Sequence, residues 1–213
     1  FFFQAHDGIR DCLLSRGLGD VYKRQGQRYI DIPIRYQRDI YARDYTAYSI
    51  EKAGAKSEDV IITSDADEII NPLILQNMDW FDGYNHYVGL QRTFYYKLNV
   101  LREEDWMGSR ICNWFKLKDT SVDQLRQSHQ DSYRIEQGGW HWSYFGNVKT
   151  IEQKLKACAD SHHGSKDLPE MVDMGKDPVG RSDLYGAVPI DDSFPEYIRN
   201  NQEKYSNLIK PWN

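Results

Sequence analysis

Residues 59–72 have the sequence DVIITSDADEIINP, and this stretch decides which fold the chain can adopt. The β-branched run over residues 60–63 predicts a fully buried strand, because a short apolar run of this kind suits the interior of a sheet. Asn71 and Pro72 predict the start of a helix. Between strand and helix lie three carboxylates, those of Asp65, Asp67 and Glu68. Acidic residues at the carboxyl end of a core strand lie where open α/β sheets bind their ligands.

Asp65 and Asp67 are separated by one small residue, so both side chains can reach the same hard divalent cation. Mg²⁺ in proteins commonly binds through one or two carboxylates and takes further oxygens from substrate phosphates. This spacing is the DxD pattern of nucleotide-sugar glycosyltransferases, in which a cation holds the diphosphate of the donor. A solvated acidic loop is the alternative interpretation of the same residues.

The composition is that of a globular protein of 213 residues, with 28% charged and 40% hydrophobic residues. The net charge of −5 and the lack of a basic run argue against nucleic acid as a partner. Fifteen Tyr and six Trp supply ring surfaces that suit a carbohydrate enzyme. No apolar stretch approaches the roughly 20 residues that a transmembrane helix needs. The three cysteines, Cys12, Cys112 and Cys158, lack metal-ligand spacing and predict a reducing compartment.

Residues 1–25 differ from the rest of the chain. Phe1-Phe2-Phe3 is too short for the apolar core of a signal peptide, and charged residues follow at once. The segment is similar to translated sequencing-adapter read-through at the ends of environmental gene fragments, and residues 19–25 are its recurring part. We therefore expect residues 1–25 to be non-native, one domain to cover residues 26–213, and the natural chain to be truncated at its N-terminus. A native, poorly ordered arm is the alternative.

The remaining chain alternates between helical and extended patterns, which predicts a single α/β domain. Apolar periodicity and turn residues predict helices over residues 34–53, 72–81, 120–129, 148–159 and 193–205, the last one opened by a capping box. Runs of β-forming residues predict strands over residues 60–63, 86–98, 109–117 and 138–146, of which the second is bent or split in two.

Two motifs carry a family resemblance. The elements SDADEI at residues 64–69 and GGWHWSYFG at residues 138–146 together resemble glycosyltransferase family 17. The likeness covers residues 28–205 and includes weaker agreement at residues 36–38, 94–99, 106–108, 154, 177–181 and 189–191. This family includes the transferase that adds the bisecting β-1,4-linked N-acetylglucosamine of animal N-glycans. That enzyme has a further aspartate where this chain has Leu73.

The resemblance implies a fold, a donor and a reaction. The fold would be of the glycosyltransferase A type, a mixed sheet flanked by helices, with its uridine-binding strands upstream of residue 26. The donor would be UDP-N-acetylglucosamine, the acceptor a glycan, and the new linkage β-1,4-like with inversion at the anomeric carbon. Such a protein would be cytoplasmic in a bacterium, with membrane association left open, or bound to the Golgi membrane in a eukaryote.

The resemblance also implies roles for particular residues. Asp65 and Asp67 would hold Mn²⁺ or Mg²⁺ together with the donor diphosphate. Trp140 and His141 would lie across the donor site, with His141 a candidate ligand or phosphate contact. A packed, hydrogen-bonded histidine is the alternative for His141. The remaining donor- and phosphate-binding candidates are Arg38 and Lys154, either of which can equally be a helix-surface charge.

Inversion by direct displacement requires a base within about 3 Å of the acceptor hydroxyl. The acidic turn before Trp106 supplies three candidates, Glu103, Glu104 and Asp105, although a turn of this kind is also well explained by solvation. Glu68 is a further candidate, and it can instead cap the helix that follows or orient a metal ligand.

Two other functions use the same residues. A carbohydrate- or nucleotide-binding remnant without catalysis is one alternative, and a metal-dependent hydrolase that uses the acid cluster is the other. The pair His162-His163 is a weaker metal candidate, because adjacent histidines in a polar stretch are usually surface residues.

Overall fold

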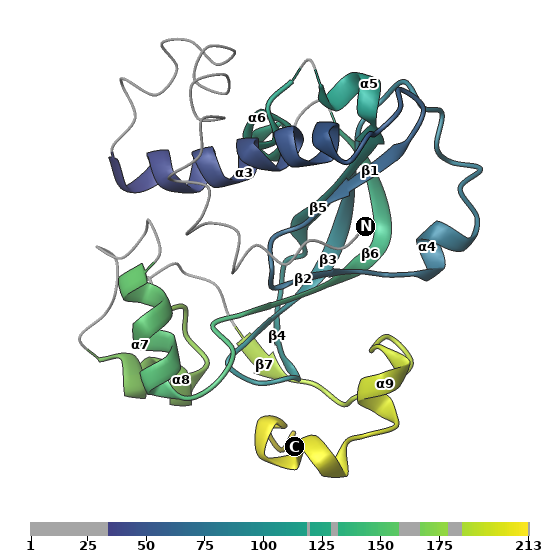
Figure 1. The fold of residues 1–213 in the computed structure, drawn as a ribbon. Coiled ribbons are helices and arrows are strands. Elements are labelled where there is room, and N and C mark those ends of the chain that lie inside the picture. The colour runs from purple at the N-terminus through teal and green to yellow at the C-terminus, as the bar shows by residue number, and fades with distance from the viewer. Residues whose placement is uncertain (1–33, 119, 129–131, 158–166, 179–184, 213) are drawn as a thin grey trace.

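The computed structural model describes residues 34–118, 120–128, 132–157, 167–178 and 185–212 (Figure 1). The N-terminal segment 1–25, Cys12, Cys158 and the pair His162-His163 lie outside the described residues.

The described residues form a seven-stranded mixed sheet with helices around it (Figure 1). The central strand β3 pairs antiparallel with β5 and β4 and parallel with β6. From these strands, β1 extends the sheet beyond β5, β7 beyond β4, and β2 beyond β6. The strands are β1 (Val60–Thr63), β2 (Glu68–Ile70), β3 (Tyr87–Tyr95), β4 (Val100–Arg102), β5 (Trp106–Asn113), β6 (Tyr133–Ser143) and β7 (Tyr185–Ala187).

Most of the described helices pack in three groups, each on its own apolar cluster. The helices are α3 (Ile34–Lys52), α4 (Leu73–Gln76), α5 (Trp114–Leu117), α6 (Val122–Gln127), α7 (Val148–Ala157), α8 (Leu168–Met174), α9 (Glu196–Arg199) and the 3₁₀ helix η3 (Glu203–Leu208). Helices α3, α5 and α6 pack together against β1 and β5. Helices α7 and α8 pack against the carboxyl end of β3, and the segment around α9 covers Phe94 and Trp140.

The expected helices over residues 34–53, 120–129 and 148–159 are confirmed as α3, α6 and α7, with ends that differ by at most two residues. The strand expected over residues 86–98 is confirmed as β3, one strand with a register shift against both of its neighbours. In these segments the spacing of apolar and aromatic residues, together with the turn residues at their ends, predicts the element type correctly.

Three expectations about local structure are wrong. The helix over residues 72–81 ends after one turn at Gln76, and the strand over residues 109–117 becomes helix α5 from Trp114 onward. The helix over residues 193–205 is divided into α9 and η3, and Pro195 at its start makes no side-chain capping bond. In each of these segments the local pattern does not show where the element ends, because tertiary packing decides it.

The prediction that β1 is fully buried is also wrong. Within the described part of the chain β1 pairs only with β5, so it lies at an edge of the sheet. Val60 and Ile62 are 40% and 38% exposed, whereas Ile61 packs against the α3–α6 cluster. The β-branched run therefore has one face covered by helices and one face open in this structure.

The glycine pair at the centre of β6 is required by close packing of three strands. A Cβ atom on Gly138 would come within 2.4 Å of the Gly89 Cα atom in β3. Gly139 has a positive φ of 144°, and a Cβ atom there would lie 2.1 Å from the Ile69 carbonyl oxygen in β2. Only glycine fits both positions, and the two residues let β6 approach β2 and β3 together.

Candidate active site

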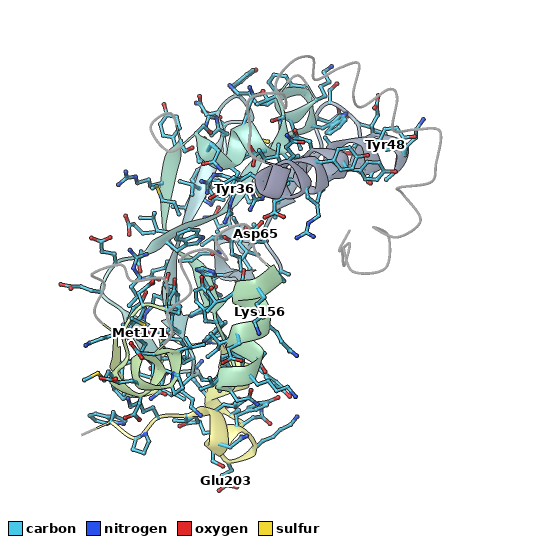
Figure 2. All side chains as sticks on the ribbon, turned by 90° about the vertical axis from the view of Figure 1, so that its left-hand side faces the viewer. Tyr36, Tyr48, Asp65, Lys156, Met171 and Glu203 are labelled. Atoms are coloured by element: carbon cyan, nitrogen blue, oxygen red, sulfur yellow. The ribbon has the colours of Figure 1, made fainter. Side chains whose placement is uncertain are left out.

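The acidic residues lie in a tight turn between β1 and β2. The backbone N–H of Glu68 donates to the Asp65 carbonyl at 3.0 Å, and the Asp65 N–H donates to Glu68 Oε2 at 3.2 Å. The turn leaves the side chains of Asp65 and Asp67 35% and 30% exposed. Figure 2 shows Asp65 between α3 and α7, which lie on opposite sides of the turn.

Two arginines hold the Asp65 carboxylate. Asp65 Oδ2 lies 3.3 Å from Arg43 Nη2 on α3 and 3.0 Å from Arg126 Nη2 on α6. Arg43 also pairs with the buried Asp123 at 3.2 Å, and Arg126 pairs with Glu68 at 2.9 Å. Burial alone would lower the pKa of both guanidinium groups, but these carboxylates outweigh it and raise the pKa above its ordinary value.

The Asp67 carboxylate faces different partners. Lys154 Nζ on α7 lies 2.6 Å from Asp67 Oδ2 and also donates to Ser143 Oγ at 3.1 Å. His141 Nε2 on β6 lies 3.6 Å from Asp67 Oδ1. Burial would raise the pKa of Asp67, but the neighbouring His141 and Lys154 outweigh it and hold that pKa well below its ordinary value. Asp67 is therefore ionised throughout the physiological range.

The pairing of β2 with β6 brings His141 to this site. His141 lies directly opposite Glu68 in the strand register. Its ring packs on the Trp106 indole with centroids 5.1 Å apart, and its side chain is only 9% exposed. His141 Nδ1 is buried and has no hydrogen-bond partner among the described residues. A buried nitrogen without a partner is uncommon in proteins and is often completed by a ligand or a water molecule.

The oxygen atoms of the two aspartates at this turn suit a hard divalent cation that takes only a few of its ligands from the protein. Asp65 Oδ2 accepts a hydrogen bond from Arg43 and lies 3.0 Å from Arg126 Nη2, and neither of these contacts involves Asp65 Oδ1. In those residues no three side chains of the His, Cys, Asp and Glu types gather into a metal-binding group. Two carboxylates alone match a cation such as Mg²⁺ that takes its remaining ligands from water and phosphate.

Several predicted site residues lie elsewhere. The buried Trp140 faces the cluster of Phe94 and Phe194, and its indole N–H donates to the Ser193 carbonyl at 2.9 Å. It stacks on Trp142, and strand alternation places both on the face opposite His141. The structure therefore does not bring Trp140 together with Asp65 and Asp67.

Arg38 is also turned away from the acidic turn. Its side chain is 72% exposed, lies 3.8 Å from Asp39 and donates to the Ala157 carbonyl at 2.9 Å. The base candidates Glu103, Glu104 and Asp105 are exposed in the turn between β4 and β5, where Glu104 pairs with Arg102 at 3.3 Å. Leu73, the position of the additional aspartate in the animal enzyme, is 65% exposed on α4.

Sequence reasoning missed Arg43 and Arg126, which lie at the acidic turn. Arg126 follows the buried Leu125 in α6, and Arg43 belongs to a long helix with several charged residues. The contacts that select these two arginines join residues 22 and 58 positions or more apart, and no local pattern encodes them.

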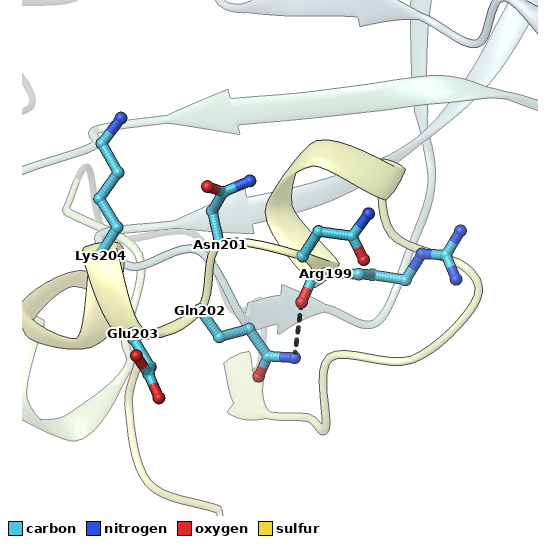
Figure 3. Close-up of a pocket in the computed structure, with 6 residues that line it drawn as sticks. Arg199, Asn201, Gln202, Glu203 and Lys204 are labelled. Carbon is cyan, nitrogen blue, oxygen red and sulfur yellow. Dashed lines mark hydrogen bonds between the residues drawn. The ribbon is translucent and has the colours of Figure 1, made fainter.

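Two open cavities lie away from this turn. One of about 360 Å³ is lined by residues 199–204 at the junction of α9 and η3 (Figure 3). Figure 2 places Glu203 at the far end of the molecule, well apart from Asp65. The other, of about 430 Å³, is lined by residues of β4 and β7 together with Glu103 and Val188. Neither includes an acidic residue of the β1–β2 turn.

Comparison with protein families identifies the class of the chain. The family described as glycosyltransferase family 17 matches residues 21–209, which include the acidic turn, β6 and α7. The chain belongs to this family and is therefore a glycosyltransferase, as the motifs at residues 64–69 and 138–146 predicted. No curated protein and no solved structure matches the chain. In the described residues no helix combines the length and apolar character needed to cross a bilayer.

Proposed function

We propose that this protein is a metal-dependent inverting glycosyltransferase that transfers N-acetylglucosamine from UDP-N-acetylglucosamine to a glycan acceptor in a β-1,4-like linkage. The sheet would then be part of a glycosyltransferase A type fold. The observation that carries this proposal is the turn at the end of β1, where Asp65 and Asp67 are ringed by three basic side chains. This arrangement suits a cation and a diphosphate bound side by side.

The charges of the turn support a diphosphate-binding role. Arg43, Arg126 and Lys154 each lie within 3.3 Å of one of the two aspartates. A divalent cation on the carboxylates would compete with these basic groups for the same oxygens. The freed N–H groups would then be available to phosphate oxygens, to which guanidinium and ammonium groups bind strongly.

Each side chain would then have a definite part in the reaction. Asp65 and Asp67 would hold Mn²⁺ or Mg²⁺, which supplies Lewis-acid stabilisation of the leaving diphosphate when it is bound. Lys154 and the arginines would neutralise the remaining phosphate charge. The base for the acceptor hydroxyl would come from the exposed carboxylates Glu104 and Asp105 in the turn before Trp106.

A donor-hydrolysis assay tests the proposal. The protein is incubated with a panel of nucleotide sugars and, separately, with a simple phosphoester, in the presence of Mn²⁺, Mg²⁺ or a chelator. We expect release of UDP from UDP-N-acetylglucosamine that depends on the metal, and no turnover of the phosphoester. Hydrolysis of the phosphoester would instead favour a hydrolase, and a lack of any metal-dependent turnover would favour a binding remnant.

A further inference from the structure

The carboxylate of Glu68 is surrounded by hydrogen-bond donors. Its Oε1 accepts from the Trp106 indole N–H at 2.7 Å and from the Arg126 guanidinium. Its Oε2 accepts from Arg126 Nη1 at 2.9 Å and from the Asp65 backbone N–H at 3.2 Å. An ionised carboxylate has about four lone-pair positions, so these donors occupy all of them. The side chain is also 0% exposed, which leaves it unsuited to meet an acceptor hydroxyl.

Glu68 is connected to Asp65 in two ways. It accepts from the Asp65 backbone N–H, which fixes the main chain at the start of the turn. It also holds Arg126, whose Nη2 atom lies 3.0 Å from Asp65 Oδ2. The guanidinium is planar and rigid, so its two bonds to Glu68 also orient the N–H group that faces Asp65.

Glu68 is connected to Asp67 through a pair of rings. The indole N–H of Trp106 points at Glu68 Oε1 and fixes the orientation of that ring. The Trp106 ring packs against His141 at 5.1 Å, and His141 Nε2 lies 3.6 Å from Asp67 Oδ1. One buried carboxylate is thus linked to Asp65 through Arg126, and to Asp67 through Trp106 and then His141.

Hydrogen bonds to β5 also hold Arg126 and the end of α6 in place. Arg126 Nη1 donates to the Gly108 carbonyl of β5 at 3.2 Å. The buried Arg110 of β5 donates to the Leu125 and Arg126 carbonyls at 3.2 and 2.7 Å, which ties the end of α6 to the sheet. Arg126 therefore cannot leave Asp65 by a movement of its helix without breaking these bonds.

We propose that Glu68 is a positioning residue that sets the spacing and orientation of the Asp65 and Asp67 carboxylates for one divalent cation. This inference rests on the proposed function, because it takes the cation site at these two aspartates as given. Groups that orient metal ligands without touching the metal commonly change metal affinity by about 10–100-fold when they are removed. Glu68 has contacts of this kind, with Arg126 toward Asp65 and with Trp106 toward His141 and Asp67.

The experiment measures Mn²⁺ binding to the full chain in the presence of UDP, with free Mn²⁺ followed by its electron paramagnetic resonance signal. Glu68→Asp keeps the charge but is one methylene too short to reach both Trp106 and Arg126. We expect Glu68→Asp and Glu68→Gln to weaken Mn²⁺ binding by about 10–100-fold. If Glu68→Gln loses Mn²⁺ affinity while Glu68→Asp binds Mn²⁺ normally, only the charge of residue 68 matters, and the proposal is overturned.

The matched control is Asp177→Asn, another exchange of a buried carboxylate for an amide. Asp177 is 1% exposed and accepts from the Tyr185 hydroxyl at 3.1 Å. We expect this variant to bind Mn²⁺ like the unaltered chain, even where it lowers the melting temperature. Should the Glu68 variants fail to fold, Trp106→Phe removes the indole N–H and replaces the indole by a smaller aromatic ring, and we expect a loss of Mn²⁺ affinity of about tenfold.

Two further arms separate the remaining outcomes. Normal Mn²⁺ affinity together with lost turnover in Glu68→Gln would identify Glu68 as the base and overturn the positioning role. If Asp65→Asn binds Mn²⁺ as well as the unaltered chain, the cation site itself is wrong, and the failure lies in the proposed function.

A separate nuclear magnetic resonance measurement follows the indole N–H of Trp106, whose signal is assigned with Trp106→Phe. This signal should shift when Mg²⁺ and UDP are added. An unmoved resonance in a chain that binds both would contradict the connection through Trp106.

Discussion

The two aspartates of the acidic turn are held by very different surroundings. Asp65 is bound by two arginines, and each of these is itself paired with a buried carboxylate, Asp123 or Glu68. Asp67 is bound by Lys154, whose side chain is 40% exposed, and lies near the imidazole of His141. The arginines of Asp65 are thus fixed by two buried carboxylates, which makes the Asp65 side a closed network. On the Asp67 side the main partner is a half-exposed lysine, which makes that side open.

The difference indicates how the turn can be both fixed and adaptable. Buried charged networks are costly to break, because removal of one partner leaves the other desolvated and unpaired. Exposed ion pairs exchange partners with little change in free energy, since water replaces the lost contact. We therefore expect the Asp65 side to determine the geometry of the turn, and Lys154 to move readily between Asp67 and a bound phosphate.

The largest expected effect is on activity. In the proposed mechanism, Asp65→Asn and Asp67→Asn each remove a carboxylate charge from the cation site, and several kcal/mol of transition-state stabilisation would be lost with the metal. Transfer should fall by about three orders of magnitude or more in either variant, with cooperative melting retained. Steady-state rates at saturating Mn²⁺ check this prediction, and a variant with normal rates would show that its aspartate does not bind the metal.

The second prediction contrasts the two sides in stability. Arg126→Ala leaves the fully buried Glu68 carboxylate without its cation, so the free energy of unfolding should fall by about 3–5 kcal/mol. Lys154→Ala removes a half-exposed partner and should cost about 0–1 kcal/mol. Urea unfolding of both variants measures the difference. An equal decrease in the free energy of unfolding of the two variants would contradict the distinction between a closed Asp65 side and an open Asp67 side.

The third prediction concerns His141, which lies beside Asp67 and packs on Trp106. His141→Ala removes the ring beside Asp67 but leaves the strand pairing of β6 intact. Turnover should fall by about 10–100-fold, the range for groups that orient metal ligands. The variant should still melt cooperatively. A destabilised variant whose folded fraction has normal turnover would identify His141 as a structural residue.

The smallest effect is expected at Arg38. Its side chain is 72% exposed and contacts Asp39 and the Ala157 carbonyl rather than the acidic turn. Arg38→Ala should leave the donor KM and the turnover number unchanged, because surface substitutions of this kind have little effect. A clear rise in KM would show that Arg38 reaches the donor during the reaction.

The sequence predicts the elements and the motif more securely than the site around them. Helices α3, α6 and α7 follow from apolar periodicity, and the family follows from the motifs at residues 64–69 and 138–146. The exposed face of β1 could not be predicted, because a β-branched run indicates a strand but does not distinguish a central strand from an edge strand. Arg43 and Arg126 could not be selected either, since only tertiary packing brings α3 and α6 to the turn.

The aromatic strand shows where a simple rule would have improved the prediction. Trp140 and His141 were both expected across the donor site, although neighbouring strand residues face opposite sides of a sheet. The structure places His141 beside Asp67 and Trp140 in the apolar cluster with Phe94. Which face lies toward the site is decided by the pairing of β6 with β2, a contact between residues about 70 positions apart that the sequence does not reveal.

Binding of UDP, measured by calorimetry with Mn²⁺ and again with a chelator, tests the central claim most directly. We predict that UDP binds to the unaltered chain only when Mn²⁺ is present, and that Asp65→Asn and Asp67→Asn each abolish this binding. Equal affinity for UDP in the chelator, or undiminished binding in both variants, would contradict a cation held at the acidic turn.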